Sequence, residues 1–211
     1  MYNISDEVRA MREKYQIEIE KRINGFESDY AFTAVDFADM ADTDPTNKAL
    51  SRLCEDGSIR RIIQGVYYKP TYSKLLNEYS APSIEKVAKA LARKFNWTIA
   101  PSGDTALNYL HLSTQVPNKW CYISDGPYRS YEVGPYCIEF KHCANKEISG
   151  RSYITITVIQ ALKCIGKNNI QPEDIDRLAS VLSEGDKGTI LQEAVTTTAW
   201  VYRLLKEVCT S

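Results

Sequence analysis

The sequence has 211 residues, of which 44% are hydrophobic and 25% are charged, and its formal net charge is −1. This is a globular composition, and the length suffices for one large domain or two small ones. No apolar stretch is long enough to cross a bilayer, and the polar start MYNISDEVRAMREK lacks the apolar centre of a secretory signal. We therefore expect a cytoplasmic protein without a membrane partner. Because the chain is not basic overall, binding to nucleic acid has to come from a local patch.

Two helices are predicted near the N-terminus. An apolar stripe at intervals of three and four residues predicts the first over residues 6–24, with Gly25 as its stop. Thr33 is a good N-cap for a short second helix, and Asp36 is placed to complete a variant of the capping box. Phenylalanines on both sides of this start occupy the positions of a hydrophobic staple.

A third helix and a hairpin follow after a tight turn. Asp44 is expected to cap the helix, with Pro45 at its first position and Gly57 beyond its end. β-Branched residues predict strands over 59–63 and 66–69, joined by a two-residue turn. The predicted order, two helices around a tight turn and then a hairpin, is that of a winged helix-turn-helix. In such a protein the helix after the turn enters the major groove of DNA.

The rest of the chain predicts a second domain. Residues 71–83 are predicted to form a connector, and its Ala81-Pro82 step divides a winged-helix domain, 1–80, from a C-terminal domain, 81–211. The patterns predict strands over 97–100, 120–124 and 136–142, and helices over 84–95, 104–110, 152–166 and 187–208, with one more that begins at 172. The expected fold class is mixed α+β: an N-terminal winged helix-turn-helix, then an α+β domain that ends in helices.

The polar face of the third helix and the hairpin carry the candidate DNA contacts. Amide, hydroxyl and basic side chains hydrogen-bond bases and phosphates, and the N-terminus of a helix adds a dipole that favours a phosphate. Between Pro45 and Pro70 the chain has 5 basic and 2 acidic residues, a local excess of positive charge. The candidates are Thr46, Asn47, Lys48, Ser51 and Arg52 in the helix and Arg60, Arg61, Gln64 and Lys69 in the hairpin. The alternatives are an ordinary solvated helix face and a winged helix that binds only proteins.

A second basic surface is a further possibility in the C-terminal domain. Its candidates are Arg129, Lys141, Lys146 and Arg151. The alternative for these residues is a solvated strand edge with its adjoining loop.

The sequence offers little for catalysis or metal binding. Ser102 follows a proline and could act as a nucleophile, but the chain has only His111 and His142 as bases and no G-x-S-x-G elbow. The simpler interpretation is that Ser102 or Asp104 caps the next helix while Gly103 permits the turn. The six cysteines match no zinc spacing, and alternation along a strand would turn His142 away from Cys137 and Cys143. We expect no catalytic residue, no cofactor and no metal.

The segment LSRLCEDGSIRRIIQGVYYKP resembles the winged helix of AbiEi-type antitoxins. That family commonly shows a leucine-arginine-leucine helix, an acidic-glycine turn, a basic hairpin and a Gly-Val-Tyr exit. Farther along, IAPSGDTALNYLHLSTQVP and CYISDG are similar to the start of the family's antitoxin domain, and EISGRSYITITVIQALKCIGK is similar in a less specific way. The resemblance extends from Phe32 to the last helix. The long first helix and the acidic residues around the winged helix depart from the family pattern.

The resemblance implies an antitoxin of a type IV toxin–antitoxin system, of the kind tied to abortive infection as a defence against phage. Its winged helix would repress its own operon by binding inverted repeats in double-stranded promoter DNA, through the helix and hairpin residues named above. Its C-terminal domain would counter a nucleotidyltransferase-like toxin without the stable inhibitory complex of other systems. We therefore expect a protein that is not an enzyme. A protein-interaction module without DNA binding, and an enzyme that acts on nucleic acid or nucleotides, stay open as alternatives.

Overall fold

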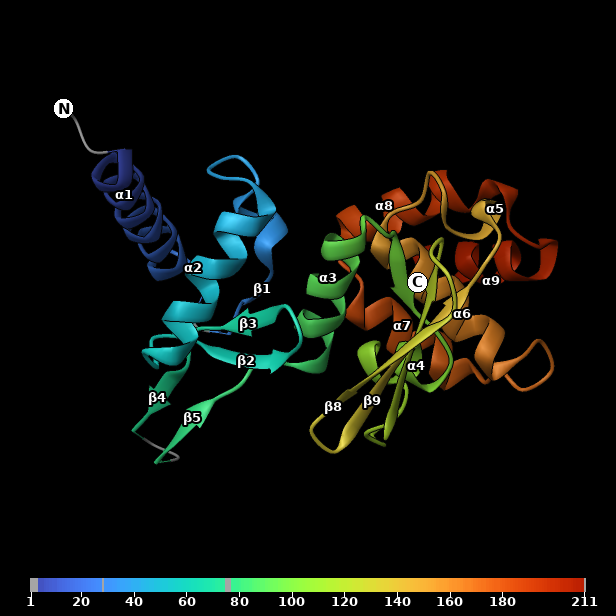
Figure 1. The fold of residues 1–211 in the computed structure, drawn as a ribbon. Coiled ribbons are helices and arrows are strands. Elements are labelled where there is room, and N and C mark those ends of the chain that lie inside the picture. Colours follow the sequence, from blue (N-terminus) through green and yellow to red (C-terminus); the bar gives the residue numbers. More distant parts are fainter. Residues whose placement is uncertain (1–3, 28, 75–76, 211) are drawn as a thin grey trace. The chain divides into compact units, whose positions relative to one another are not determined.

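The computed structural model describes residues 4–27, 29–74 and 77–210, and the side chains of residues 4–12 and 73 lie outside the described part. Contacts divide the chain into two compact units, Met1–Asn96 and Trp97–Ser211. The predicted mixed α+β class is confirmed, because the first unit combines helices with short strands and the second begins with a sheet and ends in helices (Figure 1). Among the described residues, no helix is long and apolar enough to cross a membrane.

The N-terminal unit has the element order and strand order of a winged helix-turn-helix. Its three-stranded antiparallel sheet runs β1-β3-β2, so the first strand pairs with the far arm of the hairpin. The central strand β3 is buried along its whole length, whereas β2 forms an edge with exposed residues. The elements are α1 (Ile4–Asn24), β1 (Ala31–Phe32), the 3₁₀ turn η1 (Ala34–Phe37), α2 (Thr43–Glu55), β2 (Arg60–Ile63) and β3 (Val66–Tyr68). In this arrangement α2 is the helix after the turn, and we call the β2–β3 hairpin the wing.

Apolar side chains from these elements form one core. Ile19 and Ile23 of α1 are buried, as the predicted stripe requires; the part of that stripe before residue 13 lies outside the described side chains. Phe32 and Phe37 pack edge to face with ring centroids 5.9 Å apart, which is the contact expected of the hydrophobic staple. The second predicted helix between them exists as the single 3₁₀ turn η1.

Helix α2 begins earlier than its sequence suggests. We expected Asp44 to cap it with Pro45 at the first position, but the helix begins at Thr43 and Asp42 precedes it. The reason is that the backbone amide of Thr46 donates to the carbonyl of Asp42 at 3.1 Å, which closes the first helical turn there. Proline is still tolerated because its missing N–H falls within the first turn. The predicted stop is confirmed at Gly57, which has a φ of +78°.

The residues after the wing form a second hairpin and a helix, and they belong to the N-terminal unit. Within the predicted connector, β4 (Thr71–Ser73) and β5 (Glu78–Ser80) pair as a second antiparallel hairpin. The predicted helix α3 (Ile84–Phe95) follows, capped by the Ser83 hydroxyl, which accepts a hydrogen bond from the Lys86 amide. It packs against β1, η1 and β3, and the contacts place it in the compact unit that ends at Asn96, whereas the predicted domain boundary is at Ala81-Pro82.

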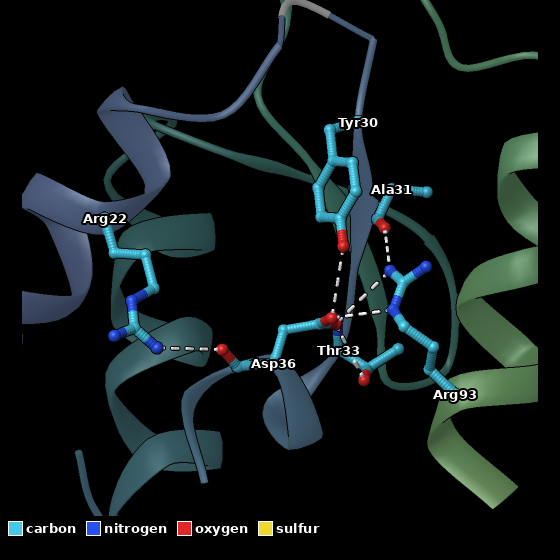
Figure 2. Close-up of polar contacts among 6 residues, drawn as sticks. All are labelled: Arg22, Tyr30, Ala31, Thr33, Asp36 and Arg93. Carbon is cyan, nitrogen blue, oxygen red and sulfur yellow. Dashed lines mark hydrogen bonds and ion pairs between the residues drawn. The ribbon is translucent and has the colours of Figure 1, made fainter. Parts of the chain in front are cut away.

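A buried carboxylate joins α3 to the turn of the winged helix (Figure 2). The side chain of Asp36 is 8% exposed and accepts hydrogen bonds from the Thr33 amide at 2.8 Å, the Tyr30 hydroxyl at 3.3 Å and the Arg93 Nε at 2.7 Å. Arg93 also donates from Nη2 to the carbonyl of Ala31 at 2.7 Å. Burial raises the pKa of the Tyr30 phenol, and the negative charge of Asp36 raises it further. Asp36 thus serves as the predicted capping-box residue and as the partner of a distant arginine.

The C-terminal unit is built on a four-stranded sheet of order β6-β7-β9-β8. β7 and β9 are parallel, and the other two pairings are antiparallel. Its first elements are β6 (Ile99–Pro101), α4 (Asp104–Tyr109), β7 (Lys119–Ser124), β8 (Arg129–Val133) and β9 (Tyr136–His142). The helices that follow are α5 (Asn145–Ile148), α6 (Tyr153–Ile165), α7 (Pro172–Val181), α8 (Glu184–Glu193), the turn η2 (Ala194–Thr196) and α9 (Ala199–Thr210). The core of this unit lies among α4 and the helices α6 to α9.

Two elements of the C-terminal unit differ from the prediction. The segment expected to be a loop between the second and third predicted strands contains β8, which pairs with β9 from Arg129 to Val133. The last predicted helix, 187–208, is two helices, because the chain leaves helical geometry at Thr197, which has a φ of −78° and a ψ of 177°. Thr197 lies in a run of β-branched residues, 195–198, which lose side-chain freedom in a helix.

Replacing the buried carboxylate tests its role in the fold. We expect Asp36→Asn to lower the free energy of unfolding by about 3 kcal/mol, the lower end of the range for a broken buried ion pair, because Arg93 is partly exposed. Asp39→Asn is the matched control, since Asp39 pairs with Arg22 at 2.5 Å but is 66% exposed, and it should unfold like the wild type. Urea unfolding is best followed by circular dichroism, because Trp97, Trp120 and Trp200 all lie in the C-terminal unit. Equal losses of unfolding free energy in the two variants would contradict the assignment of Asp36 as the buried charge that holds the fold.

Candidate nucleic-acid interface

Helix α2 presents one apolar face and one polar face. Ala49, Leu50 and Leu53 are buried in the core of the N-terminal unit. On the polar face, Asn47, Lys48 and Arg52 are exposed and Ser51 is half-buried. These four predicted positions are therefore accessible to a ligand, and their amide, hydroxyl and basic groups are the types that bind base edges and phosphates.

Thr46 does not belong to this surface, contrary to the prediction. It is 0% exposed, and its hydroxyl donates to the carbonyl of Asp42 at 2.9 Å. The hydroxyl is used inside the first turn of α2, where it satisfies a carbonyl next to the helix start. We therefore remove Thr46 from the candidate contacts.

The N-terminus of α2 is a poorer anion site than the sequence suggested. The helix begins one residue after Asp42 and carries Asp44 in its first turn, and both side chains are exposed. Carboxylates at this end are stabilised by the helix dipole themselves, and they repel a phosphate. Binding of a phosphate has to depend on the basic side chains farther along α2 and on the wing.

The two adjacent arginines of the wing point to opposite faces of it. Successive side chains of a strand alternate, and the contacts agree. The guanidinium of Arg60 lies 4.3 Å from the ring centroid of Tyr79 in the second hairpin. Arg61 donates from Nη2 to the hydroxyl of Tyr67 at 3.3 Å. Both arginines are exposed, so the wing offers one cation on each of its faces.

The other two wing candidates, Gln64 and Lys69, differ in exposure. Gln64 is exposed in the wing turn. Lys69 is half-buried and donates from Nζ to Oδ1 of Asn24 at 2.6 Å, so it connects the exit of the wing to the end of α1. Of these two, Gln64 is the better placed to meet a ligand.

A cleft of about 530 Å³ lies between α2, the wing and the end of α3, and we call it the wing cleft. Its polar lining consists of Thr43 and Asn47 from α2, Arg61 and Gln64 from the wing, and Lys94 from α3. Among the residues that the structure describes, no acidic one lines it. Of the basic residues counted in the sequence, Arg61 lines the wing cleft, and Lys94 of α3 adds a second cation there.

Sequence reasoning missed two residues near this surface. Lys94 was assigned to another domain, and only the packing of α3 on the N-terminal unit brings it to the wing cleft. Tyr79 was placed in a connector, and only the β4–β5 hairpin brings it to Arg60. Neither position has a local sequence signal, because each contact depends on segments that are separated in sequence.

The four predicted residues of a second basic surface do not form one surface. Arg129 is opposite Phe140 in the register of β8 and β9, so it shares a face with Phe140 and lies on the opposite face of the sheet from Lys141. Arg129 lies 5.8 Å from the Trp97 ring, and Lys141 pairs with Glu139 at 3.3 Å. The hydrogen bond from Lys141 lowers the pKa of Glu139.

Arg151 has a structural function in the C-terminal unit. Its guanidinium donates to the carbonyls of Lys146 at 3.0 Å, Glu147 at 3.1 Å and Glu193 at 3.3 Å, and to the hydroxyl of Thr196 at 2.8 Å. It therefore holds α5 against the segment between α8 and α9. Lys146 remains exposed beside it.

The groups considered for catalysis are engaged in ordinary contacts. Ser102 is buried and its amide donates to the carbonyl of Cys121 at 2.9 Å. Nδ1 of His142 lies 2.9 Å from the carbonyl oxygen of Gly126.

The sequence matches the model of a family of unknown function (DUF6088) over residues 18–190. The chain belongs to this family. The match begins within α1 and ends within α8, so it includes the whole wing cleft and most of the C-terminal unit. A search of curated proteins gives no match. One family model thus spans parts of both compact units.

A substitution at Thr46 tests whether this residue is structural. We expect Thr46→Val to lower the free energy of unfolding by about 1 kcal/mol, because the hydrogen bond to the carbonyl of Asp42 is lost from a buried site. Asn47→Ala, at the neighbouring exposed position, should change it by less than about 0.5 kcal/mol. Urea unfolding followed by circular dichroism measures both. If Asn47→Ala lowers the free energy of unfolding more than Thr46→Val does, the assignment of Thr46 as structural and Asn47 as an exposed residue is wrong.

Proposed function

We propose that this protein binds double-stranded DNA through α2 and the wing and represses transcription. The observation that supports the proposal is the position of the wing cleft, which lies beside α2 and the wing and has no acidic side chain among its described lining residues. In a winged helix-turn-helix, the helix after the turn reads base edges in the major groove, while basic side chains on the hairpin bind the flanking phosphates. The residues we assign to DNA are Asn47, Lys48, Ser51, Arg52, Arg60, Arg61 and Gln64.

The side chains divide into two classes by what they can recognise. Asn47 and Arg52 can form paired hydrogen bonds with the edges of adenine and guanine, respectively, so they are assigned to sequence recognition. Arg60 and Arg61 on the wing are assigned to phosphates, which supply affinity without sequence choice. This division gives each class a distinct experimental signature.

We further propose that the protein is an AbiEi-type antitoxin of a type IV toxin–antitoxin system and represses its own operon at inverted repeats. The resemblance of the winged-helix and downstream segments supports this part. The C-terminal unit, Trp97–Ser211, is assigned to countering a nucleotidyltransferase-like toxin, without a stable complex between the two proteins. Both activities depend on binding and need no catalytic residue of this chain.

A protein-interaction module is the second candidate, and one observation favours it. Tyr72 and Tyr79 on the β4–β5 hairpin are 47% and 50% exposed and pack edge to face, with ring centroids 5.2 Å apart. Tyrosine and arginine are enriched at protein interfaces, and Arg60 lies against this pair. If the purified protein ignores its promoter but co-purifies with the product of a neighbouring gene, this function replaces DNA binding.

Removal of the wing arginines tests the phosphate contacts. We expect Arg60→Ala/Arg61→Ala to weaken binding to all DNA sequences and to reduce the slope of log K against log salt by up to about two. The matched control is Lys167→Ala/Arg177→Ala, which removes two exposed basic residues from the C-terminal unit and should bind like the wild type. Gel shifts on promoter and unrelated DNA at several salt concentrations measure both quantities.

The recognition helix should respond differently. Asn47→Ala or Arg52→Ala is expected to cost about 1–3 kcal/mol on the operator and to reduce the preference for it over unrelated DNA. The salt slope should change less than in the wing variant. Undiminished operator binding after all four substitutions would refute DNA recognition by this surface.

Co-expression tests the antitoxin activity separately from repression. A toxin encoded by a neighbouring gene should arrest growth when expressed alone, and the full chain should restore growth. The quadruple variant at positions 47, 52, 60 and 61 should still restore growth when both genes are driven from foreign promoters, because these positions lie outside the C-terminal unit. Failure of the wild-type protein to protect would reject the antitoxin proposal while leaving DNA binding intact.

A further inference from the structure

Lys94 brings a third element of the N-terminal unit to the DNA-facing surface. It lies in the last turn of α3 and donates from Nζ to the carbonyl of Gln64 in the wing turn at 3.0 Å. The approach is close, because a Cβ built on Gly65 would lie 2.6 Å from that Nζ. The ammonium group is therefore held beside the tip of the wing, on the side where the wing cleft opens.

The position of Lys94 depends on the ion pair between the preceding residue, Arg93, and the buried carboxylate of Asp36. Arg93 binds Asp36 of η1 at 2.7 Å, and Lys94 and Phe95 then line the wing cleft opposite Asn47 of α2. The element that carries Asp36 also lines the cleft, through Ala34. The ion pair thus fixes the wall of the cleft that carries Lys94.

The charges in the cleft favour an anion. Arg61 and Lys94 both line it, and none of its described lining residues is acidic. Asn47, Gln64 and Thr43 add neutral hydrogen-bonding groups. Two cations in one concave surface repel each other, and an anion between them removes that repulsion. The cleft lies between the recognition helix and the wing, where a duplex bound by both would place its backbone.

We propose that Lys94 and Arg61 bind the same DNA backbone phosphate in the wing cleft, so that the DNA-binding surface extends onto α3. This inference rests on the proposed DNA-binding function and names a further residue of that site. The carbonyl of Gln64 orients the ammonium group, and Arg61 supplies the second cation. A phosphate held from both sides fixes the position of the backbone relative to Asn47, which reads the adjacent base.

The test compares neutral and charged substitutions at position 94 in the full chain. Lys94→Gln and Lys94→Met should weaken binding to all DNA sequences about three- to tenfold and reduce the slope of log K against log salt by about one. Lys94→Arg keeps the cation and should retain the slope of the wild type. Lys89→Gln is the control, because Lys89 lies on the same helix and pairs with Glu85 at 2.6 Å; it should bind like the wild type.

A double substitution tests whether the phosphate is shared. The loss of affinity in Lys94→Gln/Arg61→Gln should be smaller than the product of the two single losses, because each substitution acts on the same contact. A fully multiplicative loss would place the two side chains on different phosphates and overturn the shared site.

Two outcomes separate this inference from the proposed function. If the neutral variants at position 94 lose affinity but keep the salt slope of the wild type, Lys94 only positions the wing through Gln64 and the inference is wrong. The inference is also wrong if the neutral variants at position 94 bind DNA like the wild type while the wing variant at positions 60 and 61 binds more weakly. In both cases the proposed function stands. If the wild-type chain binds no DNA at all, the proposed function fails and the inference with it.

Discussion

The N-terminal unit depends on one buried carboxylate. Asp36 accepts hydrogen bonds from Thr33, Tyr30 and Arg93, and a buried charge is tolerated only when it is paired and hydrogen-bonded in this way. Arg22, near the end of α1, donates to the backbone carbonyl of the same residue at 3.1 Å. The contacts therefore join α1, β1, η1 and α3, which come together only in the native fold. An exposed ion pair would not exclude other packings of α3, whereas a buried one does, because any displacement leaves a charge without its partner.

The same contact determines which residues surround the candidate interface. Residues next to the ion pair on both of its elements, Ala34 and Val35 of η1 and Lys94 and Phe95 of α3, form a wall of the wing cleft. The turn of a winged helix-turn-helix normally has the task of orienting the recognition helix. Here it also fixes a third helix beside the wing. The proposed DNA-binding surface is thus larger than the helix and hairpin that define the motif.

Local signals in the sequence predicted the elements whose boundaries depend on neighbouring residues. The capping position at Thr33, the stop at Gly57 and the wing turn at Gly65 all occur where the sequence placed them. Elements that depend on distant pairing were missed. The strand β8 exists because it pairs with β9, and β4 exists because it pairs with β5. Neither has enough alternation of its own to distinguish a strand from a loop.

The candidate site was predicted in part for the same reason. The helical period correctly placed Asn47, Lys48 and Arg52 on the exposed face of α2, but it could not show that the Thr46 hydroxyl turns back to the helix start. A count of charges along a contiguous segment also could not include Lys94, since the residue reaches the cleft through an ion pair between positions 57 residues apart. Distance in sequence thus limited the prediction for Lys94, whereas at Thr46 the limit was the orientation of one hydroxyl toward a carbonyl four residues earlier.

The stacking of Arg60 on Tyr79 has a consequence for the thermodynamics of binding. A free arginine side chain has about 2 kcal/mol of rotamer entropy, which an interaction with a ligand normally removes. With its guanidinium already 4.3 Å from an aromatic ring, Arg60 loses part of that freedom when the protein folds. Contact between this arginine and an anion then carries a smaller entropic penalty than contact with a freely moving side chain. The second hairpin would in this way strengthen binding by restricting the motion of Arg60.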